Sequence, residues 1–326
     1  MDLSYTQNME DYHLWLAFGG RREGTYIDIG AGHPVADNVS FFFYERGWRG
    51  IVVEPQPRLL DLYGRIRPRD VAVAALIGTQ RGLSDFHVFD KLHGLSTTSA
   101  QHAQAAQALG ASFTTRKVPT MTLADLCIQQ TLAVIDFLKV DVEGAEADVL
   151  RSGDWNRFRP RAVVVEAIAP GSNEPSWQGW EPFLLAQGYR FMLFDTLNRF
   201  YVAEEQPDLA AHFPRERAPW DCVRHMYEIG RAPENAKHPE HALTKVLARG
   251  FWSALPFLDR ELIADLLERG RSASSAEVVD AALASLEGEE FRARLGRIAC
   301  GYDGGQIYPD DQDAASPIEG GSASKK

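Results

Sequence analysis

The sequence predicts an α/β fold, with a doubly wound, mostly parallel sheet that ends in an antiparallel hairpin and a small helical C-terminal region after it. Three observations predict this fold. Short apolar runs alternate with helical patterns in the first half of the chain, and such runs are typical of strands buried on both faces. A short turn joins two later strand-like runs, and beyond about residue 208 only helical patterns remain.

Four apolar runs are the expected strands of the parallel sheet: 26–29, 51–54, 137–141 and 162–166. A helix is expected between the first two strands, with Asp37 as its N-cap and Gly47 at its end, which completes a βαβ unit. The run at 71–77 is expected to add a further strand to the same sheet.

The runs at 189–194 and 199–202 are separated only by the turn-like residues 195–198. Strands joined this closely must be antiparallel. A parallel sheet finished by a hairpin is the edge arrangement of class I methyltransferases, whereas a plain dinucleotide-binding domain usually keeps its strands parallel. This comparison is an analogy between folds.

Helical capping patterns follow the hairpin. Asp259 is expected to cap a helix that ends before Gly270, and residues 274–277 form a capping-box pattern before the next helix. The expected organisation is a domain at 1–225, a helical region at 226–300 and a disordered tail at 301–326, since the tail is rich in Gly, Asp, Ser and Pro.

The composition excludes several classes of protein. Lys and Arg number 34 against 45 Asp and Glu, a net charge of −11, whereas nucleic-acid binders carry the opposite sign. The chain has neither an apolar run of membrane-spanning length nor a signal-peptide pattern, so a cytoplasmic protein without a membrane span is expected. Three widely spaced cysteines predict reduced, buried thiols and no zinc site.

A glycine-containing turn follows the first strand and predicts a nucleotide-type site. Its candidate cofactor-binding residues are Asp28, Gly30, Ala31 and Gly32. The third glycine of a dinucleotide fingerprint would stand at the position of Val35, so a pyrophosphate cradle matches poorly. Glu54 ends the second strand near the offset, about 20 residues, at which an acid accepts from ribose hydroxyls. Together these features favour S-adenosylmethionine over NAD.

Five sequence blocks, in order, resemble the FkbM family of S-adenosylmethionine-dependent O-methyltransferases. The blocks are Ser4–Asp11 (SYTQNMED), Tyr26–Pro34 (YIDIGAGHP), Gly47–Pro55 (GWRGIVVEP), Phe137–Glu146 (FLKVDVEGAE) and Val164–Glu166 (VVE). The resemblance covers about residues 4–205. It implies a class I fold, S-adenosylmethionine as methyl donor, and an acceptor hydroxyl, often on a sugar of a glycan, glycolipid or secondary metabolite. It also adds Gln7 to the candidate cofactor-binding residues.

The expected catalytic groups are carboxylates, because strand ends of a doubly wound sheet meet at the ligand-binding edge. Asp141 and Glu143 are the first candidates for removing the acceptor proton, with His33 or Glu166 assisting. An exposed carboxylate is a poor base for a hydroxyl, so either burial and neighbouring charge raise its pKa or a metal lowers the pKa of the hydroxyl. Glu166 and Asp141 could instead hold a divalent ion; the sequence does not favour this alternative.

Other interpretations stay open at this stage. An NAD-dependent oxidoreductase and a non-catalytic binding protein are the alternative functions, and a homo-oligomer is open. Trp177 and Trp180 could form a sugar platform or pack in the core. His238 and His241 favour a solvated helix start over a metal site. Glu146 is expected to be a salt-bridge partner within a helix.

Overall fold

The computed structural model describes residues 3–89, 94, 96–108, 110–170, 172 and 174–303. The chain folds as two compact units, Met1–Glu228 and Ile229–Lys326, and each unit is described by itself. The sequence places this boundary after residue 225, three residues earlier. The expected disordered tail lies outside the described residues from residue 304 onward, and residues 301–303 belong to the last helix.

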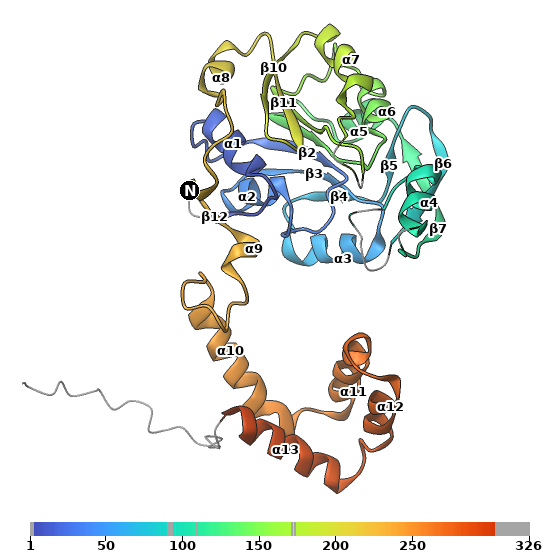
Figure 1. Cartoon of the computed structure of the whole chain (residues 1–326), viewed down its shortest axis with the longest axis vertical. Helices are drawn as coiled ribbons and strands as arrows, with labels where there is room; N and C mark the ends of the chain where they lie inside the picture. Colours follow the sequence, from blue (N-terminus) through green and yellow to red (C-terminus); the bar gives the residue numbers. More distant parts are fainter. Residues whose placement is uncertain are drawn as a thin grey trace, which may run out of the picture. The chain divides into compact units, whose positions relative to one another are not determined.

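The first unit is built on a seven-stranded sheet (Figure 1). From one edge to the other its strands are β10 (Tyr189–Phe194), β11 (Asn198–Ala203), β9 (Ala162–Glu166), β8 (Phe137–Val140), β2 (Thr25–Ile29), β3 (Arg49–Val53) and β4 (Val71–Val73). Neighbouring strands from β9 to β4 are parallel, and β11 is antiparallel to both β9 and β10. The hairpin therefore closes the sheet as predicted, which confirms the class I methyltransferase-like fold.

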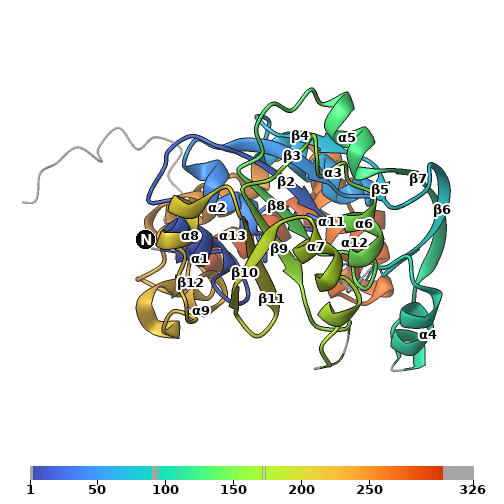
Figure 2. The ribbon, with the colours of Figure 1, turned by 90° about the horizontal axis from the view of Figure 1, so that it is seen from above.

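Helices cover both faces of this sheet (Figures 1 and 2). The core on one face includes side chains of α1 (Glu10–Ala17), α2 (Val39–Glu45), α3 (Pro57–Ile66) and α8 (Pro207–His212). The core on the other face includes side chains of α5 (Leu123–Gln129), α6 (Glu146–Arg151) and α7 (Glu181–Ala186). Because both faces are covered, the central strands are mostly apolar, as the continuous runs predict, with Asp28 in β2 and Lys139 in β8 as buried exceptions.

Helix α2 shows one correction to the sequence prediction. Its N-cap is Asn38, whose side chain accepts a hydrogen bond from the Phe41 N–H at 2.8 Å. Asp37 was the expected cap, but its backbone has a positive φ of 52° and it precedes the cap position. The end of the helix is as predicted, since Gly47 follows it at a φ of 98°.

The run at 71–77 is not one strand, which is a second correction. Its first part is β4, and its last part is β5 (Leu76–Ile77), which belongs to a separate three-stranded sheet. The chain turns between them, where the Ala75 N–H donates to the Val73 carbonyl. The other strands of the small sheet are β6 (Gly82–Val88) and β7 (Thr114–Met121); α4 (Ala100–Ala108) lies between them in sequence.

The ends of the first unit meet in a two-stranded parallel sheet. Strand β1 (Leu3–Ser4) pairs with β12 (Arg224–His225). His13 adds a second link, because its Nε2 accepts a hydrogen bond from the Ala218 N–H at 3.0 Å. Helix α9 (Met226–Ile229) and the short 3-10 turns Trp177–Gly179 and Trp220–Cys222 complete the elements up to the boundary.

The second unit is helical, as predicted. It contains α10 (His241–Ala254), α11 (Arg260–Arg269), α12 (Ala276–Ala284) and α13 (Glu289–Asp303), with 3-10 turns at Leu255–Phe257 and Gly270–Ala273. The Asp259 side chain caps α11 by accepting from the Leu262 N–H at 2.9 Å. Ser275 caps α12, one residue later than the capping-box pattern suggests. The small core of this unit contains Leu255, Ile263, Leu286, Phe291 and Leu295.

Among the described residues, no helix combines the length and the apolar character that crossing a membrane requires.

Candidate functional site

A pocket lies at the carboxyl ends of β2, β3, β8 and β9, where a doubly wound sheet binds its ligands. It encloses about 1100 Å³ including its open mouth. Nine of the ten residues predicted for the site line it: Gln7, Gly30, Ala31, Gly32, His33, Glu54, Asp141, Glu143 and Glu166. The fold therefore brings together residues that are up to 159 positions apart, from Gln7 to Glu166.

The turn after β2 forms one wall of the pocket and requires glycine. Gly30 has a φ of 74°, and a Cβ atom there would lie 1.7 Å from the carbonyl oxygen of Asp141. Gly32 has a φ of 60°, and the space in which its Cβ would stand is open. Backbone can therefore approach a ligand closely at Gly32, whereas at Gly30 it approaches the neighbouring strand.

Glu54 follows β3 and connects this turn to the next loop. Its carboxylate accepts from the Gly32 N–H at 3.0 Å and from the Gln56 N–H at 2.8 Å. The side chain is buried, and burial raises its pKa to about 7 although both N–H donors favour the charged form. Glu54 thus joins the two backbone segments that frame this side of the pocket.

Asp28 is the one predicted site residue that does not line the pocket, and it lies beneath the pocket wall. It is 2% exposed, and its Oδ2 accepts from the Ser40 hydroxyl of α2 at 2.5 Å. Side chains alternate along a strand, so Asp28 lies on the same face as Tyr26, the face that α1, α2, α3 and α8 cover. Burial raises the pKa of Asp28, and the nearby Lys139 opposes that effect. In this structure Asp28 therefore contacts Ser40 beneath the pocket, and its predicted role in binding the cofactor stays a prediction.

Lys139 is a site residue that the sequence analysis does not single out. It is 6% exposed in the middle of β8, beside Asp28 in the strand register, and its Nζ lies 2.8 Å from Oδ2 of Asp141. Burial lowers the pKa of this lysine, but Asp141 and Asp28 outweigh burial and raise it above its usual value. A lysine inside an otherwise apolar strand is the sequence signal that could have revealed it.

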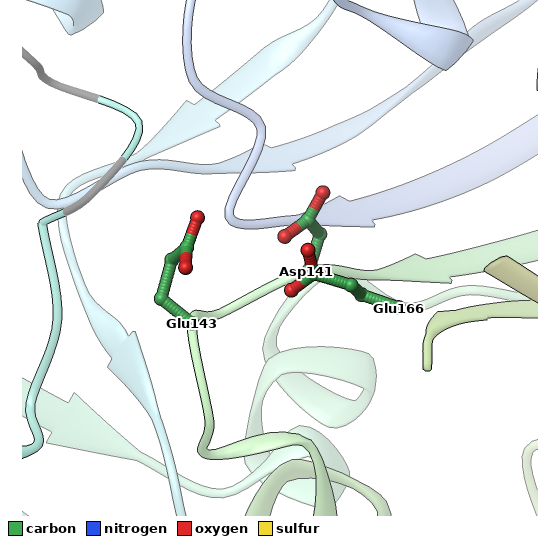
Figure 3. A group of neighbouring side chains, drawn as sticks. All are labelled: Asp141, Glu143 and Glu166. Atoms are coloured by element: carbon green, nitrogen blue, oxygen red, sulfur yellow. The ribbon is translucent and has the colours of Figure 1, made fainter. Parts of the chain in front are cut away.

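Asp141, Glu143 and Glu166 form an acidic cluster in the pocket (Figure 3). One carboxylate oxygen from each residue lies within 4.8 Å of the others. Burial, with repulsion from Asp141, raises the pKa of Glu143 to about 8 and that of Glu166 to about 11. Oε2 of Glu166 is buried and has no hydrogen-bond partner among the described residues. At neutral pH this cluster therefore holds at least one proton.

The cluster supports two kinds of chemistry. A carboxylate whose pKa lies near neutrality is a suitable general base for a hydroxyl, and Glu143 fits that requirement. Three carboxylate oxygens are also hard donors of the kind that Mg²⁺ prefers, and they would supply roughly half of an octahedral shell. Lys139 already neutralises part of the charge on Asp141, which weakens the attraction of the cluster for a cation.

The backbone around Glu143 is strained. Its φ is 55°, in the left-handed region that costs a residue other than glycine about 1–3 kcal/mol. In this conformation the Glu143 side chain lines the pocket, and Figure 3 shows it as a neighbour of Asp141 and Glu166.

The predicted assistant His33 is placed differently from the acids. Its Nδ1 accepts hydrogen bonds from the Val35 and Ala36 N–H groups, at 3.1 and 3.0 Å. In the neutral ring the proton then stands on Nε2, so the lone pair that would take up a proton is engaged by backbone. This geometry favours the carboxylates over His33 as the base.

Several other interpretations can now be decided. Glu146 forms no salt bridge within the described part of the chain; its Oε1 accepts from the Val142 and Gly144 N–H groups at 3.2 and 3.0 Å. Trp180 is 2% exposed and packs in the core. His241 begins α10, and its Nδ1 contacts the Ala232 carbonyl, so the helix-start interpretation is confirmed. The cysteines are free, but only Cys127 is buried.

Comparison with known proteins adds to this geometry. A family model described as the methyltransferase FkbM domain matches residues 28–191, half of the chain. The chain belongs to the FkbM methyltransferase family. The segment matched by the FkbM model contains the glycine turn, Glu54 and the whole acidic cluster. Gln7 and the second unit lie outside the matched segment. The predicted resemblance is confirmed, and the chain is a methyltransferase.

Among solved structures, this FkbM methyltransferase is similar to an O-methyltransferase from Bacillus cereus in complex with SAH. The two chains are 12% identical, the match covers 61% of this chain and 80% of the other, and the TM-score is 0.33. No curated protein sequence matches the chain.

Proposed function

We propose that this protein transfers a methyl group from S-adenosylmethionine to a hydroxyl group, on a sugar of a glycan, glycolipid or secondary metabolite. One observation carries the proposal: a single pocket joins the glycine turn and Glu54 to the acidic cluster of Asp141, Glu143 and Glu166. The first part suits a nucleoside with a ribose, and the second suits the removal of a proton.

In the cofactor half, the open space at Gly32 lets backbone approach the ligand, and Glu54 is the acceptor for ribose hydroxyls. The apolar residues Ala75, Leu76 and Ile77 line the same pocket and offer a surface for an adenine ring. Gln7 lines it from the N-terminal segment. None of these contacts requires a pyrophosphate, which is consistent with Val35 in place of the third glycine.

The proposed reaction is an in-line displacement. The acceptor oxygen forms a bond to the methyl carbon while the bond from that carbon to the sulfonium sulfur breaks, and S-adenosylhomocysteine leaves with the electron pair. The hydroxyl proton passes to the carboxylate of Glu143 and later to solvent. Asp141, paired with Lys139, and Glu166, which keeps its own proton, position the acceptor.

The alternative functions have less support. An oxidoreductase would need the pyrophosphate cradle that Val35 interrupts, and the chain belongs to a methyltransferase family. A non-catalytic binding protein would not need an acidic cluster held by a strained backbone, since strain persists where the surrounding structure enforces it. The cytoplasmic location stays a prediction from the sequence, and a homo-oligomer stays open.

The test is incubation with S-adenosylmethionine labelled on its methyl group and a panel of hydroxyl-bearing glycans, glycolipids and free sugars. We expect label in an acid- and base-stable ether of one acceptor class, together with S-adenosylhomocysteine. Label on a carboxylate would give a base-labile ester and would contradict the hydroxyl acceptor. Binding of S-adenosylmethionine with no transfer to any acceptor would favour the binding-protein alternative.

A further inference from the structure

The backbone carbonyl of Glu143 is contacted by side chains from another segment of the chain. It accepts a hydrogen bond from the Thr97 hydroxyl at 2.9 Å and lies 3.3 Å from Nδ1 of His102. A carbonyl can only accept, so Nδ1 carries the proton in the second contact. Both donors come from the segment before and within α4, which is about 40 residues away in sequence.

Thr97 is itself fixed in place. Its backbone exchanges two hydrogen bonds with His87 of β6, at 2.9 and 3.2 Å, and its side chain is 1% exposed. The same hydroxyl accepts from the Ser99 N–H at 3.0 Å, so its own proton is directed at the Glu143 carbonyl. The small sheet thus provides an anchored donor.

His102 makes a second close approach to this loop. A Cβ atom on Gly144 would lie 2.5 Å from Cε1 of His102, so the imidazole ring packs directly against the backbone beside Glu143. A separate group, the Glu146 carboxylate, accepts hydrogen bonds from the N–H groups of Val142 and Gly144. Thr97 and His102 therefore contact the carbonyl of this loop, and Glu146 accepts from its N–H groups.

We propose that Thr97 and His102 are positioning residues for methyl transfer: by holding the Glu143 carbonyl they keep the residue in its left-handed conformation and its carboxylate in the cluster with Asp141 and Glu166. This inference rests on the proposed function of Glu143 as the base. Ser96 and Thr98, the two neighbours of Thr97, line the same pocket, so the anchoring segment also forms part of the pocket wall.

The decisive comparison is Thr97→Val against Thr97→Ser in the full-length chain. Valine keeps the shape and removes the donor, whereas serine keeps the donor. We expect Thr97→Val to lower kcat about tenfold, because small displacements of a reacting group are costly. KM for the acceptor and affinity for S-adenosylhomocysteine should stay within about twofold, and Thr97→Ser should recover most of kcat. Equal kcat values for the two variants would overturn the proposal.

Three further variants protect this test from a folding defect. His102→Asn keeps an N–H near the Nδ1 position and His102→Leu removes it, so only the leucine variant should lose kcat. Thr120→Val is the matched control, since it removes a threonine hydroxyl that donates to Ser84 within the same small sheet and does not contact Glu143. A loss of kcat in Thr120→Val equal to that in Thr97→Val would assign the effect to the sheet in general and overturn the proposal.

A measurement independent of activity separates this inference from the proposed function. The ¹³Cα and ¹³Cβ chemical shifts of Glu143, assigned in glutamate-labelled protein by comparison with Glu143→Gln, report whether its φ is positive. We expect left-handed values in the wild type and in Thr97→Ser, and a change toward ordinary values in Thr97→Val. Unchanged shifts in Thr97→Val would overturn the positioning role, whereas failure of the wild type to methylate any hydroxyl would overturn only the proposed function.

Discussion

Buried or half-buried acids lie at both ends of the parallel strands of the main sheet. We call the side where these strands begin the amino edge and the side where they end the carboxyl edge. The acids on the two sides have very different hydrogen-bond and charge partners. At the amino edge, Asp136 is 2% exposed, and its carboxylate accepts from Arg21 and Arg161, both at 2.9 Å, and from the Thr25 N–H at 2.8 Å. At the carboxyl edge, three acids share one nearby cation, Lys139, and an oxygen of Glu166 has no partner among the described residues.

The difference indicates that the acids at the carboxyl edge lower the stability of the folded state. A satisfied acid favours the folded state, whereas crowded acids with raised pKa values and a left-handed Glu143 work against it. The same strands supply both edges, so the contrast comes from the local partners of each acid and not from the fold. Substitutions at the two edges should therefore change different measured quantities.

The largest effect is expected at the carboxyl edge. Asp141→Asn and Glu143→Gln preserve size and remove the negative charge, and at least one of them should lower kcat by about 10²–10⁴, the usual contribution of general-base catalysis. Affinity for S-adenosylmethionine, measured by calorimetry, should change far less. If both variants keep near wild-type turnover, neither acid is the base and His33 becomes the leading candidate. Loss of wild-type activity to a chelator, restored by a divalent ion, would make these acids metal ligands.

A smaller effect is expected from Glu54→Ala in the cofactor half of the pocket. Removing an acceptor of hydrogen bonds should weaken binding of S-adenosylmethionine by about 1–3 kcal/mol, which is roughly a five- to 150-fold change in Kd. Isothermal calorimetry measures this directly. An unchanged Kd would remove Glu54 from the cofactor site.

The amino edge should respond in stability alone. Asp136→Ala leaves Arg21, Arg161 and the Thr25 N–H without their shared acceptor, and it should lower the free energy of unfolding by about 1–3 kcal/mol. Both guanidinium groups are partly exposed, which limits the loss. Urea unfolding followed by circular dichroism measures the change, and kcat should equal the wild-type value. A drop in kcat without a drop in stability would contradict the comparison.

The smallest effect concerns pH. The pKa of Glu166 is about 11 in the folded protein against an ordinary value of 4.5, so the folded state holds this proton more tightly than the unfolded chain does. Its stabilising contribution is complete below about pH 4.5 and is lost as the pH rises toward 11. Glu166→Gln stays neutral throughout, so its Tm should exceed that of the wild type at pH 9, by about 2–4 °C for each kcal/mol of stability that the wild type has lost. A difference of the same size at pH 5 would point to packing instead.

Patterns within single segments predicted most of the fold. Continuous apolar runs located the central strands, and the close spacing of the last two runs identified the hairpin. The run at 71–77 was misassigned because apolar character does not show which sheet a residue joins; the turn at Ala75 depends on a backbone hydrogen bond that leaves no pattern.

The sequence predicted some residues of the candidate site and missed others, because it shows which strand ends meet but not where each side chain points. Acids at strand ends share an edge, and this topological rule located the acidic cluster. The rule does not say toward which face a side chain turns, and so Asp28 was assigned to the pocket although it contacts Ser40 beneath it. Thr97 and His102 act on Glu143 through contacts between distant segments, and nothing in the sequence near them indicates that role.

The antiparallel position of β11 also determines the order in which the sheet is completed during synthesis. In the sheet, β10 neighbours only β11, and β11 is also the neighbour of β9. As the chain leaves the ribosome, β10 emerges first and has no place in the sheet until residues 198–203 follow it. Until then the edge of β9 stays unpaired, and an unpaired edge is a template for wrong association. The interval is short, since only the three residues 195–197 separate the two strands, so the turn between them limits how long the nascent sheet is exposed.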